Sequence, residues 1–186
     1  MDSEFMQTIA RGLAAEGVKV VRFEFPYMQE RRVSGKKRPP NRQHELIEAF
    51  KKVIEDVNQP CVLMGKSMGG RMASILASMQ PLNPNVLGVV ALGYPFHPQK
   101  KPEKLRIDHM PDINIPMLIM QGTRDALGEK TYIETLPIPN DIQIHWLEDG
   151  DHDLKPRVKS GLTHEQHMST AIKQSAQFIK QCYTHN

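Results

Sequence analysis

The stretch Cys61-Val62-Leu63-Met64-Gly65-Lys66-Ser67-Met68-Gly69-Gly70 decides the fold of this chain. Its first four residues form an apolar run of strand length, and its last six match the pattern G-x-S-x-G followed by glycine. Apolar residues then recur at helical spacing, at positions 68, 72, 75, 76 and 79. A strand, a glycine-rich turn and a helix in this order predict one unit of a parallel α/β sheet.

The turn itself predicts an activated serine. In a G-x-S-x-G turn the serine has a strained backbone, and we expect Gly65 and Gly69 to be small so that the turn can close. The hydroxyl of Ser67 would stand above the carboxyl end of the strand. The backbone N–H of Met68, at the start of the helix, would then face negative charge that develops there.

Two other interpretations of these residues remain open. Gly65-Lys66-Ser67 also matches the end of a P-loop, but that motif requires glycine where the sequence has Pro60, and residues 61–64 have the pattern of a strand. The second interpretation is a glycine-rich structural turn in which the serine has no chemical role.

The rest of the chain alternates helices and strands. Helices are predicted over residues 3–16, from an N-cap at Asn41 to about 57, from just after Ser67 to Pro81, over about 128–135 and over roughly 164–183. Strands are predicted over residues 18–25, 61–64, 86–92, 117–121 and 142–147, with a basic loop after Pro26 and a proline-rich loop over 94–115. This order predicts an α/β fold, a doubly wound and mainly parallel sheet in one domain, residues 1–186.

Ser67 needs a base and an acid, and in this architecture they follow it in the order acid, then histidine. Asp125 comes just after the strand at 117–121, and His152 just after the strand at 142–147. Since the carboxyl ends of parallel strands meet at one edge of the sheet, we expect Ser67, Asp125 and His152 to form a catalytic triad. We expect the acids next to His152, at 149, 151 and 153, to be solvated.

Other residues offer weaker sites. Lys66 and His97 lie next to strand ends and are candidates for binding substrate, although a structural or exposed role suits His97 better. His164 and His167 are three residues apart but belong to no H-E-x-x-H motif, so no metal site is predicted. No cofactor is expected.

Composition narrows the class of protein. The chain has 186 residues, 39% of them hydrophobic, and no apolar run approaches the roughly 18 residues of a membrane span. Its two cysteines, Cys61 and Cys182, predict packed, reduced thiols. The net charge of +3 is concentrated in one segment (Arg31, Arg32, Lys36, Lys37, Arg38 and Arg42), which predicts a local basic loop at the mouth of the site rather than a nucleic-acid interface. We therefore expect a cytoplasmic protein with a small-molecule substrate.

Four motifs occur in the order of one superfamily: Gly65–Gly70, Gly93-Tyr94-Pro95-Phe96-His97-Pro98, Gln121-Gly122-Thr123-Arg124-Asp125 and Gly150-Asp151-His152-Asp153. With them the chain resembles the α/β-hydrolases. It is most similar to the small, lid-less, dienelactone-hydrolase-like branch that includes the testis-expressed hydrolase-like proteins. Dienelactone hydrolases proper have a cysteine where this chain has Ser67.

The resemblance implies a serine hydrolase that cleaves an ester, thioester or lactone through an acyl-enzyme. The alternative is a hydrolase-like scaffold that serves as a binding or regulatory module. Members of the family also have a central strand and a His-Gly-type loop before the first helix, and here Met1 is followed directly by that helix. The resemblance therefore implies an N-terminal truncation and the loss of one oxyanion donor.

Overall fold

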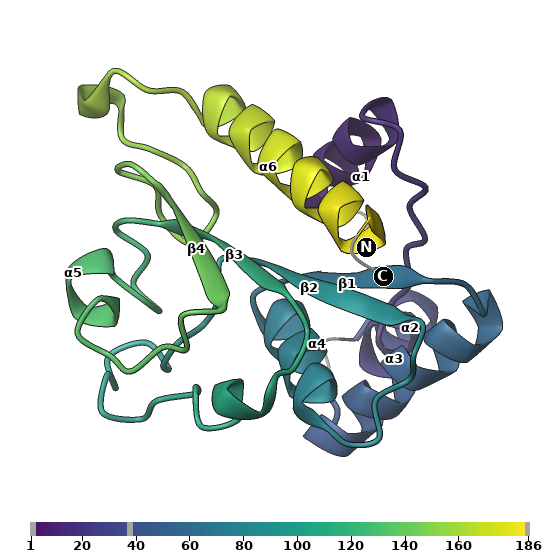
Figure 1. Cartoon of the computed structure of the whole chain (residues 1–186). Coiled ribbons are helices and arrows are strands. Elements are labelled where there is room, and N and C mark those ends of the chain that lie inside the picture. The colour runs from purple at the N-terminus through teal and green to yellow at the C-terminus, as the bar shows by residue number, and fades with distance from the viewer. Residues whose placement is uncertain (1–2, 37–38, 185–186) are drawn as a thin grey trace.

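The structure is a computed structural model that describes residues 3–36 and 39–184. Met1 and Asp2, and Lys37 and Arg38 of the basic segment, lie outside the described residues. The helices are α1 (Glu4–Ala15), α2 (Pro26–Ser34), α3 (Gln43–Val57), α4 (Met68–Ser78), α5 (Lys130–Ile133) and α6 (His164–Thr184), with short 3-10 turns η1 (Met110–Asp112) and η2 (Val158–Ser160). The strands are β1 (Cys61–Lys66), β2 (Val86–Leu92), β3 (Met117–Gly122) and β4 (Ile142–Leu147) (Figure 1).

The four strands form one parallel sheet in the order β1-β2-β3-β4. Every residue of β2 and β3 is buried, as expected for central strands whose two faces are both covered by helices. The predicted parallel α/β sheet is therefore confirmed, and all four strands direct their carboxyl ends to the same edge.

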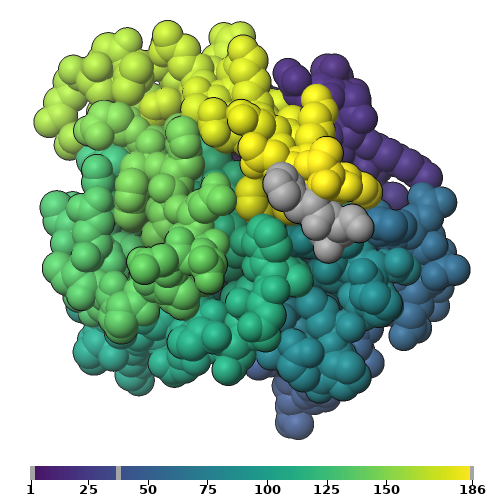
Figure 2. Space-filling view, viewed as in Figure 1, coloured from purple at the N-terminus to yellow at the C-terminus, as the bar shows by residue number. Residues whose placement is uncertain are grey.

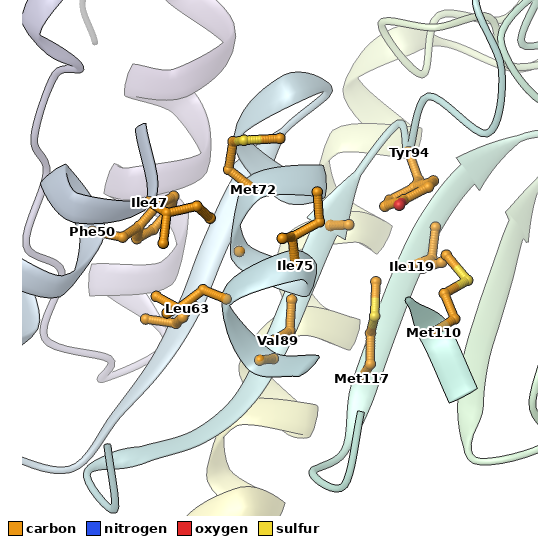
Figure 3. Close-up of a cluster of buried hydrophobic side chains, with 14 of the residues drawn as sticks. Ile47, Phe50, Leu63, Met72, Ile75, Val89, Tyr94, Met110, Met117 and Ile119 are labelled. Carbon is orange, nitrogen blue, oxygen red and sulfur yellow. The ribbon is translucent and has the colours of Figure 1, made fainter. Parts of the chain in front are cut away.

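Helices cover the two faces of the sheet with separate apolar clusters. On one face, α3 and α4 contribute Ile47, Phe50, Met72 and Ile75, which pack against β1–β3 (Figure 3). On the other face, α1 and α6 lie side by side over the strands (Figure 1). The space-filling view shows that α6 is itself part of the molecular surface, next to α1 (Figure 2). The sheet is therefore covered by helices on both faces.

The predicted strand at residues 18–25 is not formed. These residues run without regular secondary structure, and among the described residues no backbone hydrogen bond joins them to β1. Their apolar pattern serves packing instead, because the rings of Phe23 and Phe25 meet Phe50 edge-on at 4.8 and 5.6 Å. A strand requires a hydrogen-bonded neighbour as well as an apolar pattern.

Two cavities, of 190 and 830 Å³, lie between this segment and the outer edge of β1.

The predicted loop after Pro26 begins as a helix. Pro26 occupies the first turn of α2, where its missing N–H costs nothing, and Gly35 ends the helix in the left-handed conformation with a φ of 65°. The prediction that Asn41 caps the next helix is also wrong. The N-cap of α3 is Arg42, and the side-chain oxygen of Asn41 instead accepts a 2.8 Å hydrogen bond from the backbone N–H of Tyr27.

Three further properties hold for the residues that the structure describes. None of their helices is both long and apolar enough to cross a bilayer. Cys61 and Cys182 are both free thiols, and burial raises the pKa of each. Within the same residues, no group of three histidine, cysteine or carboxylate side chains is arranged to hold a metal ion.

Candidate active site

Ser67 occupies a strained turn between β1 and α4. Its φ of 52° and ψ of −117° lie outside the regions that residues with a side chain ordinarily adopt. A β-carbon at Gly65 would lie 2.3 Å from the backbone carbon of Gly69, so only glycine fits there. The expectation that Gly69 must also be small is wrong, because a β-carbon at that position meets no atom within 4 Å. The second tight position is Gly70, whose β-carbon would lie 2.8 Å from the side chain of Ala91.

Three side chains from three strand ends meet in a line. The Oγ of Ser67, after β1, lies 2.9 Å from Nε2 of His152, after β4. The Nδ1 of that ring lies 2.8 Å from Oδ2 of Asp125, after β3. An ionised carboxylate can only accept hydrogen bonds, so Nδ1 carries the hydrogen and Nε2 is free to accept the Ser67 hydroxyl proton.

Asp125 is fully buried and its carboxylate is held from two sides. Oδ1 accepts a 2.8 Å hydrogen bond from the N–H of Leu127, and Oδ2 accepts one of 2.9 Å from Nε2 of Gln121. The Oε1 of Gln121 in turn accepts a 2.7 Å hydrogen bond from the N–H of Tyr94. Sequence reasoning missed Gln121, although a single amide at the end of an otherwise apolar strand was a visible signal.

The loop that carries His152 is anchored on both sides of the ring. The expectation that Asp149 is solvated is wrong: it is buried, has a φ of 55°, and its carboxylate accepts hydrogen bonds from Arg157, which hold its pKa well below the usual range. On the other side, Nε2 of His164 lies 2.9 Å from the carbonyl of Asp153, and Nδ1 of His167 lies 2.8 Å from the carbonyl of Leu154. These hydrogen bonds tie both histidines to the loop that carries His152.

The two candidate substrate-binding residues have protein partners. Nζ of Lys66 lies 2.7 Å from Oδ1 of Asp153 and donates a 3.3 Å hydrogen bond to the carbonyl of His152. His97 is 7% exposed, its Nδ1 lies 2.9 Å from the carbonyl of Pro98, and its ring packs edge-on against Tyr132. Hydrogen bonds link neither residue to Ser67.

The 830 Å³ cavity reaches Ser67 along the outer edge of β1. Its lining is mainly apolar and includes parts of α1 and α2 and residues 20–25. Of the basic segment in the described residues, Arg31 and Arg32 line this cavity whereas Lys36 and Arg42 do not. Arg32 is paired at 2.5 Å with Glu24, which also lines the cavity, so part of the positive charge at the cavity is balanced.

Comparison with known proteins identifies the family of this chain and agrees with its fold. A family described as the alpha/beta hydrolase domain matches residues 1–180. Among solved structures, the esterase domain of a Rhodothermus marinus protein superposes with a TM-score of 0.65 at 17% identity, over 94% of this chain and 78% of that one. An esterase from Pyrococcus furiosus superposes with a TM-score of 0.64 at 15% identity, over 97% of this chain and 76% of that one. A monoacylglycerol lipase from Paleococcus ferrophilus superposes with a TM-score of 0.56 at 17% identity, over 89% of this chain and 87% of that one. The chain belongs to the alpha/beta hydrolase domain family.

Proposed function

We propose that this protein is a serine hydrolase that cleaves an ester, thioester or lactone of a small molecule. The observation that carries the proposal is the continuous line of hydrogen bonds from Ser67 Oγ through His152 to Asp125, at 2.9 and 2.8 Å. Both distances lie within the range that proton transfer requires.

Each residue has a distinct task in the proposed reaction. His152 takes the hydroxyl proton as the oxygen of Ser67 attacks the substrate carbonyl, and it returns that proton to the departing alcohol, thiol or ring oxygen. Asp125 holds the imidazole in the productive tautomer and stabilises its positive charge. A water activated by His152 then hydrolyses the acyl-enzyme and releases Ser67.

The tetrahedral intermediate carries a negative oxygen, which requires hydrogen-bond donors. We assign one donor to the backbone N–H of Met68, the first residue of α4. Its position at a helix N-terminus adds the favourable end of the helix dipole to the hydrogen bond.

The size and character of the site support a small, largely apolar substrate. The cavity at Ser67 has the volume of a small-molecule site, and its apolar lining suits an acyl or alkyl chain. The segment between β2 and β3 forms only the short turn η1, too little to make a lid domain. Together with the four motifs, these features support placing the protein in the dienelactone-hydrolase-like branch, with serine as its nucleophile.

A fluorophosphonate probe tests the proposal directly, because it reacts only with an activated serine. We expect wild-type protein and a Ser169→Ala control, altered on the exposed face of α6, to be labelled equally. Ser67→Ala should not be labelled, and its kcat on a chromogenic ester should fall about 10⁶-fold. A folded wild-type protein that resists the probe and hydrolyses no ester would instead favour the binding-module alternative.

A further inference from the structure

The cavity that reaches Ser67 carries an excess of positive charge on an otherwise mainly apolar wall. Among the described residues that line it, one is acidic, Glu24, and four are basic: Arg22, Arg31, Arg32 and Lys66. Both carboxylate oxygens of Glu24 accept hydrogen bonds from Arg32, at 2.5 and 2.6 Å. The acid is therefore already used within the protein, and it leaves the rest of the positive charge on this wall unbalanced.

Arg31 is a cation of this wall whose guanidinium group is not used by the fold. Arg32 is paired with Glu24, and Lys66 with Asp153. Arg31 forms no ion pair and no side-chain hydrogen bond with any described residue. Its side chain is exposed, so all of its N–H donors are available to a ligand that enters the cavity.

Tyr27 lies beside Arg31 on the same wall. The two residues are four apart on α2, which places them on one face of the helix, and both line the cavity. A helical side chain leans toward the N-terminus of its helix, so Arg31 leans toward the turn that carries Tyr27. The Tyr27 hydroxyl forms no hydrogen bond with the described residues. The pair therefore presents a cation and a neutral hydroxyl on one wall of the cavity.

The protein holds Tyr27 in place by groups other than its hydroxyl. The backbone N–H of Tyr27 donates a 2.8 Å hydrogen bond to Oδ1 of Asn41, and its ring stacks on Phe25 with centroids 6.5 Å apart. Burial raises the pKa of Tyr27, so the hydroxyl is protonated at neutral pH and can donate a hydrogen bond. A donor held in this way loses little freedom when a ligand binds.

One small molecule can contact this wall and the proposed nucleophile together. Ser67 and Arg31 line the same cavity, whose 830 Å³ is the size of a small-molecule site. Apolar side chains, among them Phe23, Met28 and Met68, make up most of the remaining lining. A ligand that matches this cavity has an apolar chain and one anionic end.

We propose that Arg31 and Tyr27 bind an anionic oxygen group, a carboxylate or a phosphate, at the end of an apolar chain whose ester group reaches Ser67. A guanidinium donates two parallel hydrogen bonds to such a group, and the phenol donates a third. The inference rests on the proposed function for its kinetic consequence, which is a preference for esters whose acyl chain ends in a negative charge. The binding of the anion itself does not depend on hydrolysis.

Binding is tested first, without any need for turnover. Hexanoate, hexyl phosphate and the uncharged hexanamide are added separately, and the melting temperature is followed. At about ten times Kd the preferred anion should raise Tm by roughly 3 °C or more, and hexanamide at the same concentration should not. The anion with the larger shift identifies the group. Absence of a shift with both anions, or an equal shift with hexanamide, would overturn the proposal.

Matched variants assign the site to α2. Arg31→Met keeps the apolar stem and should abolish most of the anion-dependent shift, and Tyr27→Phe, which keeps the ring, should reduce it. Lys36→Met removes a charge of the same basic segment that does not line the cavity, and it should keep the full shift. Without ligand, Arg31→Met should melt within about 2 °C of wild type, because its guanidinium has no partner to lose. A fall of several degrees would show that Arg31 is structural and would overturn the proposal.

Kinetics then measures the preference. For the 4-nitrophenyl half-ester of suberate, Arg31→Met should lower kcat/KM about tenfold to hundredfold, mainly through KM, and Tyr27→Phe should lower it about threefold to tenfold. The loss in Arg31→Met should be smaller by about tenfold on 4-nitrophenyl octanoate, the neutral ester of equal chain length. Equal losses on both esters, or a preference that survives in Arg31→Met and disappears in Arg22→Met, would overturn the assignment.

The Ser67→Ala variant separates this inference from the proposed function. It should keep the Tm shift with the preferred anion, because the proposed contacts lie on α2. A shift that requires Arg31, in a protein whose Ser67 resists fluorophosphonate, would preserve the anion site and refute the hydrolase. Fluorophosphonate labelling of Ser67 together with no anion-dependent shift would refute the anion site and leave the hydrolase intact.

Discussion

The ammonium group of Lys66 lies 2.7 Å from the carboxylate of Asp153, so an ion pair joins the residue just before Ser67 to the residue just after His152. The same ammonium donates a hydrogen bond to the carbonyl of His152. Asp153 is largely exposed, and an ion pair of that kind contributes little to stability. Its geometric effect is larger, because it links the strand end that bears the proposed nucleophile to the loop that bears the proposed base.

Lys66→Met should therefore impair positioning more than folding. We expect kcat to fall about tenfold, since a small displacement of a catalytic group is costly, with KM nearly unchanged and Tm within a few degrees of wild type. Lys52→Met, which removes the exposed pair with Asp56 on α3, should leave kcat unaltered. A rise in KM at constant kcat would contradict this expectation and restore Lys66 as a substrate-binding residue.

Gln121 should be needed both for the stability of the fold and for holding the carboxylate of Asp125 in place. Gln121→Leu leaves the buried N–H of Tyr94 without a partner, at about 1–3 kcal/mol, and removes one of the two hydrogen bonds to Oδ2 of Asp125, which keeps its contact with His152. Urea unfolding should register this loss, and Gln177→Leu on the exposed face of α6 is the control.

The isosteric Gln121→Glu variant should make stability depend on pH in a way that wild type does not. A buried glutamate beside Asp125 should have a pKa raised above its unfolded value, so the folded state binds more protons between the two values. The variant should therefore lose stability relative to wild type as pH rises from 5 to 8. A constant difference across that range would show that the new carboxyl is not in contact with Asp125.

His109 should make stability fall in mild acid. Burial and Arg71 lower its pKa to about 4, below the 6.5 of a free histidine. Between these values the unfolded chain binds the additional proton, so stability present at pH 7 is lost as pH drops through 6.5 toward 4. Nε2 of His109 lies 2.8 Å from Oγ of Ser74. His109→Gln keeps a donor for Ser74 and does not titrate, so its stability should depend less on pH in urea titrations at pH 7 and pH 4.5. Identical pH dependences would refute the assignment.

Sequence reasoning succeeded where a local pattern and its tertiary partner agree. The runs at 86–92 and 142–147 became strands with the same bounds, because each has a neighbour to pair with. It also selected Ser67, Asp125 and His152, which the structure brings into hydrogen-bond contact, because each follows a strand of one parallel sheet. Parallel order alone places such residues at a common edge.

It failed where the outcome depends on contacts that no local pattern records. Residues 18–25 have the composition of a strand, but they pack their rings on Phe50 and pair with nothing in the sheet. Gln121 supports Asp125 from within its own strand; the sequence marks its amide as unusual, but its contacts with Tyr94 and Asp125 exist only in the folded chain.

The two glycines of the G-x-S-x-G turn should respond in opposite ways to the same substitution. In Gly65→Ala the new methyl group would lie 2.3 Å from the Gly69 backbone, so the turn must open. We expect the free energy of unfolding to fall by about 3 kcal/mol, and we expect Ser67 to be no longer labelled by fluorophosphonate. In Gly69→Ala the methyl group points into open space within α4, and the better helix former should leave stability unchanged or raise it by up to about 1 kcal/mol. Labelling should persist in this second variant, although KM can change because Gly69 lines the cavity. Equal destabilisation of both variants in urea would mean that the motif acts through something other than the closure of the turn at Gly65.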